Sequence, residues 1–520
     1  MEALAPTTNL FRGKQSVRRR RLTTEYAIKA FFGSNAIVAV VVLALITIFL
    51  CREGFGFFGQ NLTNLRIYRR AGLESVDIMR PQAERHSALS RQLNTIRLEE
   101  MRARSNSPAL PAFDQFASAF SDSGDDLNAL VSDTSDQALA LRDVLLGMGR
   151  DPGDGESSKA VPAAAASIVK VDPAQGMVAL RSSDVRFDAV AASLQTKTEA
   201  LLAVPLALTD PKARTSFAQW TADTRKYIAE LPAASDQLRR WNPHTPLPVY
   251  RAITSFLFGS NWVTASFWQD WYGIIPLLVG SIMVATVALL LAVPFGVSAA
   301  IYVSEVATRT EKRLIKPYIE FISAIPSVVL GFFGIAVVGQ AIRALSQTSF
   351  MKWVSFFPIS ERLNVFTAGC LLALMAVPTI FTLSEDALRN VPRGFKEASY
   401  ALGANRLQTI VRVLIPASLS GIISAVLLGL GRVIGETMVV LLCAGNRIAI
   451  PDFTQALGLG AVFQPVHTMT GIIAQEMGEV VRGSIHYRAL FMVGLVLFVL
   501  TLGINYVAQR IVARYRLSIG

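Results

Sequence analysis

The sequence predicts an all-α membrane protein with six transmembrane helices and a large, mostly helical insert between the first and the second. Three observations lead to this class. Six apolar stretches, each with few or no charges, are long enough to cross a hydrocarbon core of about 30 Å. Residues 52–270, between the first two stretches, contain no such run. The composition is 52% hydrophobic and only 17% charged, with a mean hydropathy of +0.41, as expected of a chain that lies largely in lipid.

The first apolar stretch runs from Phe31 to Cys51 and follows a basic N-terminal segment, residues 1–30. A cleaved signal peptide would have a shorter apolar region and a small-x-small cleavage site, and the sequence has neither. A lipoprotein cysteine at Cys51 is also disfavoured, because Phe49 and Leu50 stand where small residues are expected. We therefore predict a membrane anchor, transmembrane helix 1, with its N-terminus in the cytoplasm.

The insert, residues 52–270, is rich in Ala, Ser, Asp, Arg and Gln. Leu and Ala recur at a near-helical spacing in Ile78–Met101 and Asp114–Leu146, so we predict helices there. The Gly- and Pro-containing stretch Asp151–Ser167 predicts a loop or hinge. A cytoplasmic N-terminus places this insert in the periplasm. Its mixed charge is compatible with that side, since long translocated domains escape the positive-inside rule.

Residues 271–510 form the predicted membrane core and are followed by a short cytoplasmic tail, residues 511–520. The core contains five apolar stretches: Ile274–Val303, Ile319–Gln340, Val365–Leu383, Leu419–Cys443 and Leu490–Ala508. Six spans in total place both termini inside. Lys and Arg are more frequent in the loops that this topology places inside, as the positive-inside rule requires. Prolines and glycines within the spans indicate close helix packing or a pathway.

The formal net charge of +12 does not point to nucleic acid, because the Lys and Arg residues flank apolar spans and no aromatic-interleaved basic stripe lies elsewhere. The three cysteines, Cys51, Cys370 and Cys443, lie in or beside apolar segments and have no metal-ligand spacing. The four histidines are scattered. We expect no metal site, no cofactor and no disulfide framework.

The loop after the fourth span reads EASYALGANRLQTIVRVLIP, from Glu397 to Pro416. It resembles the EAA loop of binding-protein-dependent ABC importers, whose pattern is E-A-A-x3-G-x9-I-x-L-P. The matching positions are Glu397, Ala398, Ser399, Gly403, Val413, Ile415 and Pro416. Small residues allow a short helix to sit close to a partner surface, and Gly403 permits a turn with positive φ. An amphipathic surface helix is the alternative interpretation.

The resemblance implies a MetI-like permease core and assigns Glu397, Ala398, Ser399 and Gly403 to ATPase docking. The chain itself has no G-x4-G-K-[ST] phosphate-binding loop. The ATPase is therefore expected to be a separate subunit, and this chain is expected to be a transporter subunit with no catalytic residues of its own.

Four further segments resemble the permeases of phosphate importers of the Pst type: Phe256–Glu305, Ile319–Gly334, Leu383–Pro392 and Leu427–Asn446. The GETM and GN elements of the last segment favour the PstC-like member of the permease pair. The resemblance covers the first span and about residues 250–520. It does not cover the insert, which is longer than the usual external loop of the family.

Arg432 and Glu436 stand four residues apart in the apolar segment LLGLGRVIGETMVV, so the spacing predicts one shared helix face. Ionisable residues inside a span mark functional sites by default, since burying a charge in lipid is costly. A guanidinium offers a bidentate donor fork for phosphate, and Glu436 could neutralise it when the path is empty. Thr437 is a further pathway candidate, although its hydroxyl could bond its own backbone. A purely structural pair is the alternative.

We also predict the surroundings or the effect of three other residues. Glu305 and Glu320 lie near cytoplasmic ends of spans, and we expect both at a solvated interface, with Lys316 pairing to Glu320 on one helix face. Pro326 is expected to bend the third span.

The family resemblance implies a bacterial inner-membrane complex that moves inorganic phosphate into the cytoplasm. Its expected partners are a second homologous permease, two cytoplasmic ATPase subunits, a periplasmic phosphate-binding protein and the lipid bilayer. Two alternatives remain open. The chain could carry another oxyanion, such as molybdate or sulfate. It could also be a membrane sensor that uses the periplasmic domain, although a sensor should carry a cytoplasmic output domain.

Overall fold

The structure is a computed structural model that describes residues 10–103, 109–148, 182–264, 266–351 and 357–515. The chain divides into two compact units. The membrane unit comprises residues 1–59, 254–264 and 271–520, and the insert unit comprises residues 60–253 and 265–270. The predicted hinge Asp151–Ser167 lies outside the described residues.

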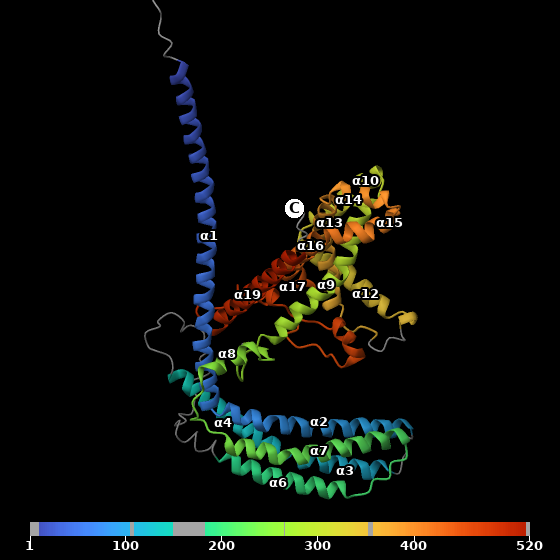
Figure 1. Cartoon of the computed structure of the whole chain (residues 1–520). Coiled ribbons are helices and arrows are strands. Elements are labelled where there is room, and N and C mark those ends of the chain that lie inside the picture. Colours follow the sequence, from blue (N-terminus) through green and yellow to red (C-terminus); the bar gives the residue numbers. More distant parts are fainter. Residues whose placement is uncertain (1–9, 104–108, 149–181, 265, 352–356, 516–520) are drawn as a thin grey trace, which may run out of the picture. The chain divides into compact units, whose positions relative to one another are not determined.

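The membrane unit is almost wholly helical (Figure 1). Its elements are α1 (Leu10–Arg70, which continues into the insert unit), α8 (Val249–Leu257, which begins in the insert unit), β1 (Trp262–Val263), β2 (Trp271–Tyr272), α9 (Ile275–Ile301), the π-helical turn η2 (Tyr302–Val306), α10 (Arg309–Ser323), α11 (Ser327–Phe333), the π-helical turn η3 (Gly334–Val338), α12 (Gly339–Ser346), the 3₁₀ turn η4 (Ser349–Met351), α13 (Val365–Arg389), α14 (Arg393–Ala401), α15 (Arg406–Thr409), the π-helical turn η5 (Ile410–Leu414), α16 (Ile415–Gly435), α17 (Met438–Cys443), the 3₁₀ helix η6 (Gln455–Phe463), α18 (Met469–Glu476) and α19 (Ile485–Tyr515).

Six helical segments of the described residues are long and apolar enough to cross a membrane, as the sequence predicts. They are Lys29–Arg70, Ile275–Val306, Ser327–Ser346, Val365–Arg389, Arg406–Gly435 and Ile485–Ala513. The fold class, a six-span helical membrane protein with a large helical insert, is confirmed.

The predicted third span, Ile319–Gln340, is wrong at its start. The chain leaves the helix after Ser323, and Pro326 precedes α11 with an extended ψ of 138°. Proline has no amide hydrogen to donate, so it suits a helix start better than a helix interior. Pro326 therefore begins the third span rather than bending it.

The preceding helix α10 is a separate amphipathic element. Its N-terminus is closed by a capping box between Thr308 and Glu311, in which each side chain accepts from the other's backbone amide. The hydrogen bond from the Thr308 amide lowers the pKa of the Glu311 carboxyl. The start of the third span is not visible in the sequence, because an apolar run continues from the end of α10 into that span.

The core of the membrane unit is built by α9, α13 and α16. Ile380 of α13 is fully buried between two glycines, Gly296 of α9 and Gly429 of α16. A Cβ atom at either glycine would lie 2.9 or 2.8 Å from Ile380. These glycines allow close helix approach, which is one of the two roles that the sequence predicts for glycines in the spans.

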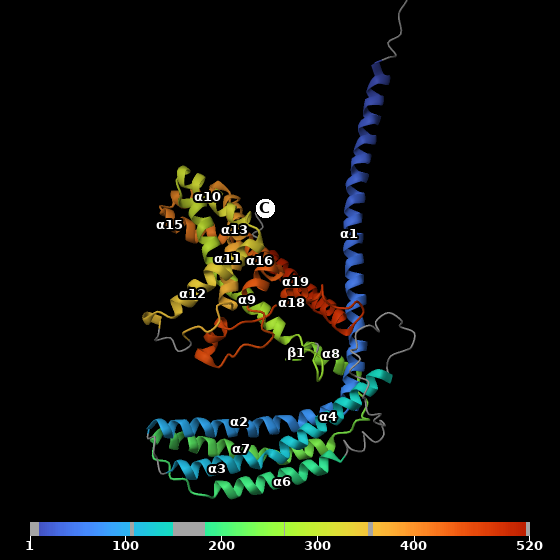
Figure 2. The same cartoon turned by 180° about the vertical axis from the view of Figure 1, so that it is seen from behind.

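The insert unit is a helical bundle of α2 (Leu73–Ala103), α3 (Leu110–Ser123), α4 (Asp125–Met148), α6 (Ser183–Leu202) and α7 (Pro211–Arg240), which lie side by side in Figures 1 and 2. An aromatic cluster forms part of its core. Phe120 and Trp220 are buried and meet edge to face, with ring centroids 5.0 Å apart, and the Trp220 indole donates to the Leu89 carbonyl over 3.0 Å. Such pairs add about 1 kcal/mol beyond the area that they bury.

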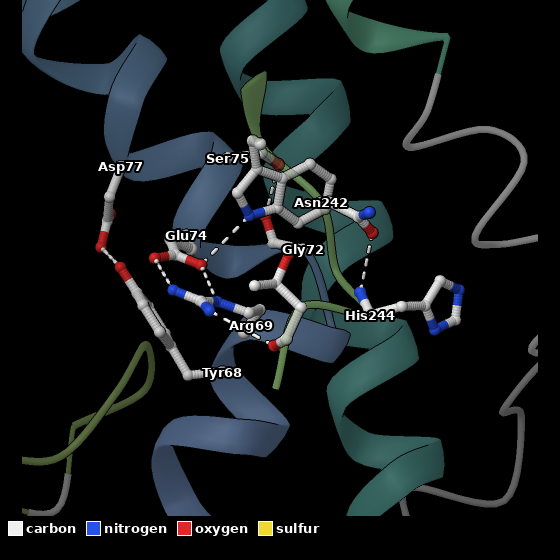
Figure 3. A network of polar contacts seen from close by, with 10 residues as sticks. Tyr68, Arg69, Gly72, Glu74, Ser75, Asp77, Asn242 and His244 are labelled. Carbon is white, nitrogen blue, oxygen red and sulfur yellow. Dashed lines mark hydrogen bonds and ion pairs between the residues drawn. The ribbon is translucent and has the colours of Figure 1, made fainter. Parts of the chain in front are cut away.

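A polar network ties the end of α1 to the start of α2 and to the segment after α7 (Figure 3). The Glu74 carboxylate accepts from the Arg69 guanidinium at 2.6 and 2.9 Å and from the Trp241 indole at 3.1 Å. Arg69 also reaches the Thr245 carbonyl at 3.4 Å. These contacts join three chain segments that enter and leave the bundle, so they stabilise the end of the bundle at which those segments meet.

Candidate substrate pathway and docking loop

The fifth span ends in a helix break at the candidate pathway. Helix α16 stops at Gly435, and Glu436 adopts an extended conformation with φ −73° and ψ 134° before α17 begins at Met438. The break is satisfied locally. The Glu436 carbonyl accepts from the Thr470 hydroxyl at 2.9 Å, and the Glu436 carboxylate accepts from the Met438 amide at 3.1 Å. Non-helical backbone in a membrane protein is tolerated where protein or a water-filled cavity surrounds it.

The predicted shared helix face of Arg432 and Glu436 is wrong, because the helix ends between them. Among the described residues no ion pair joins their side chains. The exposed Arg432 guanidinium instead donates to the hydroxyl of Thr379 on α13, 3.1 Å away. The half-buried Glu436 carboxylate turns back to the backbone of α17. The two charges therefore lie on different local elements, and Arg432 keeps donors available to a ligand.

Thr437 lies in the break itself. Its hydroxyl is 3.5 Å from the Gly435 carbonyl, so it contacts its own backbone at the limit of a hydrogen bond. This is the alternative role that the sequence left open for Thr437. The contact is long enough that it places little constraint on the hydroxyl.

Helix α18 supports the break from the other side, and sequence reasoning did not identify it. Its first residue, Met469, donates its amide to the Ser281 hydroxyl of α9 at 2.9 Å. Just before it, the carbonyl of His467 approaches Gly280 so closely that a Cβ atom at position 280 would lie 2.1 Å from the oxygen. Thr470 then reaches the Glu436 carbonyl. No sequence motif marks this chain of contacts, because its members are far apart in sequence.

The segment Glu397–Pro416, here called the docking loop, has the turn at Gly403 that the sequence predicts. Helix α14 ends in a Schellman motif: the Ala404 amide donates to the Ser399 carbonyl at 3.2 Å, and the Gly403 amide donates to the Tyr400 carbonyl at 2.9 Å. Gly403 has φ +80°, the conformation that glycine adopts at least cost. Asn405 then caps α15 through a capping box with Gln408.

The outer face of the loop is open and partly apolar. Glu397 and Ala398 are exposed, as are the side chains of Leu402 and Leu407, which are 89% and 69% exposed. Ser399 points the other way. It is buried, and its hydroxyl lies 2.9 Å from that of Thr409, which joins α14 to α15. The loop therefore presents a preformed surface on one side and is held on the other.

Glu305 is not solvated, contrary to the expectation from sequence. Its side chain is only 10% exposed and pairs with Lys396 of α14 at 2.7 Å. Glu320 is half exposed, as expected, and its distance to Lys316 is 4.0 Å. The burial of Glu305 was not visible in the sequence, because its partner lies far along the chain.

Glu385 is a second buried carboxylate that sequence reasoning missed. Its side chain is fully buried, and it lies 3.0 Å from Lys316 of α10 and 2.9 Å from Arg389 one turn further along α13. The Glu385–Arg389 spacing of four residues is a helix-face signal that could have drawn attention to it. The pair of cations balances a charge that would otherwise be costly to bury.

The described residues contain no group of three or more His, Cys, Asp or Glu side chains that could hold a metal ion. All three cysteines are free.

Comparison with known proteins identifies the class. Residues 292–517 match the family model described as binding-protein-dependent transport system inner membrane component. The chain is 34% identical over 260 residues to a probable ABC transporter permease protein, YqgH, of Bacillus subtilis, covering 49% of this chain and 77% of that protein. The chain belongs to this family of inner-membrane components and is a multi-pass permease subunit of the ABC transporter class.

Within this class the chain is a homologue of PstC permeases. It is 30% identical over 268 residues to the phosphate transport system permease protein PstC of Pasteurella multocida, covering 50% of this chain and 80% of that protein. Among solved structures, an inward-facing MetNI methionine ABC transporter aligns with 47% of this chain and 95% of that chain, at 20% identity and a TM-score of 0.34.

Proposed function

We propose that this chain is one permease of an importer that moves inorganic phosphate into the cytoplasm. Its partners are a second homologous permease, two cytoplasmic ATPase subunits and a periplasmic phosphate-binding protein. The relatives from Pasteurella multocida and Haemophilus influenzae are phosphate transport system permease proteins, which supports the substrate class. The single observation that carries the proposal is the exposed Arg432 guanidinium beside a broken helix in an apolar span.

Arg432 binds the anion in this proposal. A guanidinium presents a planar fork of donors that matches two phosphate oxygens, and it stays charged at any physiological pH. Its bond to Thr379 orients the side chain and leaves other donors free. Discontinuous helices are a recurring feature of transport sites near the middle of a membrane.

Glu436 limits how tightly the anion is held. A carboxylate near the path repels a bound phosphate, and the repulsion is stronger in a low dielectric than in water. The carboxylate is held at the break by the Met438 amide, so it is near Arg432 in sequence without neutralising it through a direct ion pair. This arrangement favours release over trapping.

In this proposal the docking loop transmits the conformational change of the ATPases to the membrane helices. Glu397, Ala398, Ser399 and Gly403 build the helix and the turn that the ATPase contacts, and the exposed apolar side chains beside them supply contact area. The proposed arrangement has both termini in the cytoplasm, with residues 1–30 and 511–520 inside, transmembrane helix 1 at 31–51, the insert 52–270 in the periplasm and the permease core at 271–510. No covalent chemistry takes place on this chain.

Uptake of labelled phosphate in cells that carry Arg432→Gln tests the proposal. We expect a loss of at least tenfold, with partial activity in Arg432→Lys, which keeps the charge and loses the fork. Arg343→Gln, which changes another arginine of the membrane unit, is the matched control and should transport normally. Normal uptake by Arg432→Gln would remove Arg432 from the mechanism. Excess sulfate or molybdate that abolishes uptake in the unaltered protein would instead indicate a different oxyanion.

A further inference from the structure

Glu305 is an enclosed charge beside the docking loop, and the proposed pathway does not explain its function. It belongs to the π-helical turn η2 at the end of the second span. The carboxylate lies 2.7 Å from the ammonium of Lys396, and its side chain is 10% exposed against 29% for Lys396. A carboxylate so far removed from water depends on its counter-ion.

A second contact joins the same two regions. The guanidinium of Arg406, at the start of α15, donates to the backbone carbonyl of Glu305. Lys396 precedes the docking loop residue Glu397, and Arg406 follows Gly403. The side chain of Glu305 is therefore held by the residue just before the loop, and its backbone by a residue in the middle of the loop. On the third side, Lys312 of α10 donates to the carbonyl of Ser304 at 2.9 Å.

The element that carries Glu305 departs from regular α-helix. In η2 the Ala307 amide donates to the Tyr302 carbonyl at 2.8 Å, five residues back, which is the wider π-helical pattern. Such turns are rare and occur often at functional sites. Apolar packing beneath the loop joins the same elements, since Val303 of η2 and Ile410 of η5 share one buried cluster.

We propose that Glu305 and Lys396 are positioning residues that tie the docking helix α14 to the end of the second span. This proposal rests on the proposed function and adds a route by which the docking loop moves the membrane helices. If the ATPase displaced α14 and η2 stayed in place, the Glu305 carboxylate would lose its counter-ion, Lys396. Movement of η2 together with α14 keeps the ion pair intact. The ion pair therefore makes movement of the loop and movement of the second span a single event.

The test uses the complete complex, with both permeases, the ATPases and the binding protein, in liposomes. Phosphate import and ATP hydrolysis are measured together. Glu305→Gln and Lys396→Met each remove one charge and keep the side-chain length. We expect at least a tenfold fall in phosphate moved per ATP hydrolysed. The exchanged pair, Glu305→Lys with Lys396→Glu, should recover to within threefold of the unaltered protein.

Glu320→Gln is the matched control, because Glu320 is also a glutamate near the cytoplasmic end of a span but is half exposed. It should transport within twofold of the unaltered complex. An unchanged ratio in both single variants would overturn the proposal, and so would an exchanged pair that performs no better than they do. If a single variant fails to assemble, the exchanged pair decides: restored assembly and coupling support the tie, and failure to restore them overturns it.

Hydrogen exchange separates this proposal from the phosphate assignment. It is measured on residues 393–404 of the assembled complex without phosphate. Loss of either charge should raise exchange in this segment at least tenfold, whereas Glu320→Gln should leave it unchanged. If the unaltered complex moves no phosphate, the proposed substrate fails while the exchange result still tests the tie. Unaltered exchange in both charge variants would overturn the proposed link between α14 and the second span, whatever the substrate.

Discussion

The guanidinium of Arg432 donates to the hydroxyl of Thr379 across 3.1 Å, and this bond joins the fifth span to the fourth. It is a side-chain contact that fixes the direction of a charge in an apolar environment. The hydroxyl takes one of the five N–H donors of the guanidinium, so the others remain available to an anion. Thr379 is therefore expected to act through Arg432 rather than on the substrate directly.

Thr379→Val removes this acceptor and keeps the shape of the side chain. A hydrogen bond contributes about 0.5–1.5 kcal/mol net, which corresponds to a rise of about 2- to 10-fold in the KM for phosphate uptake. The maximal rate should change less, because Arg432 remains present. Thr379→Ser, which keeps the hydroxyl, is the control and should be close to normal. A KM that is the same in both variants would show that this bond does not position Arg432.

Glu385→Ala should destabilise the membrane unit. The fully buried carboxylate balances Lys316 and Arg389, which are 33% and 52% exposed. Because both cations can recover some water, we expect a loss of about 1–2 kcal/mol rather than the 3–5 kcal/mol of a fully buried pair. Thermal unfolding in detergent measures it. Glu320→Ala, at an exposed pair, should change the midpoint little, and equal shifts in the two variants would contradict the burial argument.

Gly403→Ala should weaken ATPase association without unfolding the protein. A Cβ atom at position 403 meets nothing within 4 Å, so the cost is the strained backbone at φ +80° alone. That cost is about 1 kcal/mol or somewhat more. The control is Gly394→Ala, in helix α14 and equally free of contacts, which should be neutral or slightly stabilising. Co-purification of the ATPase is the measurement, and equal behaviour of the two variants would rule out a role for the turn.

The insert unit should lose stability as the pH falls below about 6.5. His86 is buried against Phe120, with ring centroids 4.5 Å apart, and burial lowers its pKa. Because the folded form holds a proton less readily than the unfolded chain, stability is full above the unfolded pKa of about 6.5 and declines as pH falls through the lowered value. Chemical unfolding of the full chain between pH 8 and 5, followed by intrinsic tryptophan fluorescence, measures this loss. His86→Gln should be less stable but should show a flatter pH profile; an unchanged profile would assign the titration to another group.

The sequence was sufficient to predict the number of spans and the turn at Gly403, because both are encoded locally. A run of apolar residues predicts a span whatever its neighbours are, and Gly403 after a short helix predicts a turn from backbone preference alone. These are short-range signals, and the structure agrees with them on the number of spans and on the φ of Gly403, whereas the third span begins later, at Ser327, and the fifth ends earlier, at Gly435.

The helix break at Glu436 and the ion pair of Glu305 were not predictable in the same way. The segment around Glu436 contains no proline, and its spacing is compatible with an unbroken helix. The break is supported by Thr470, which lies 34 residues further along the chain. Lys396 lies 91 residues from Glu305. Contacts at such separations depend on how helices pack, which periodicity alone does not reveal.

Gly280 links the second span to the helix break through a backbone approach. A side chain at position 280 would collide with the His467 carbonyl, and the displaced segment would carry Thr470 away from Glu436. A residue without a side chain thus controls the geometry of the helix break at Glu436. If the proposed pathway runs past Glu436, a single methyl group added at position 280 should alter anion transport without contacting the proposed anion-binding residue Arg432.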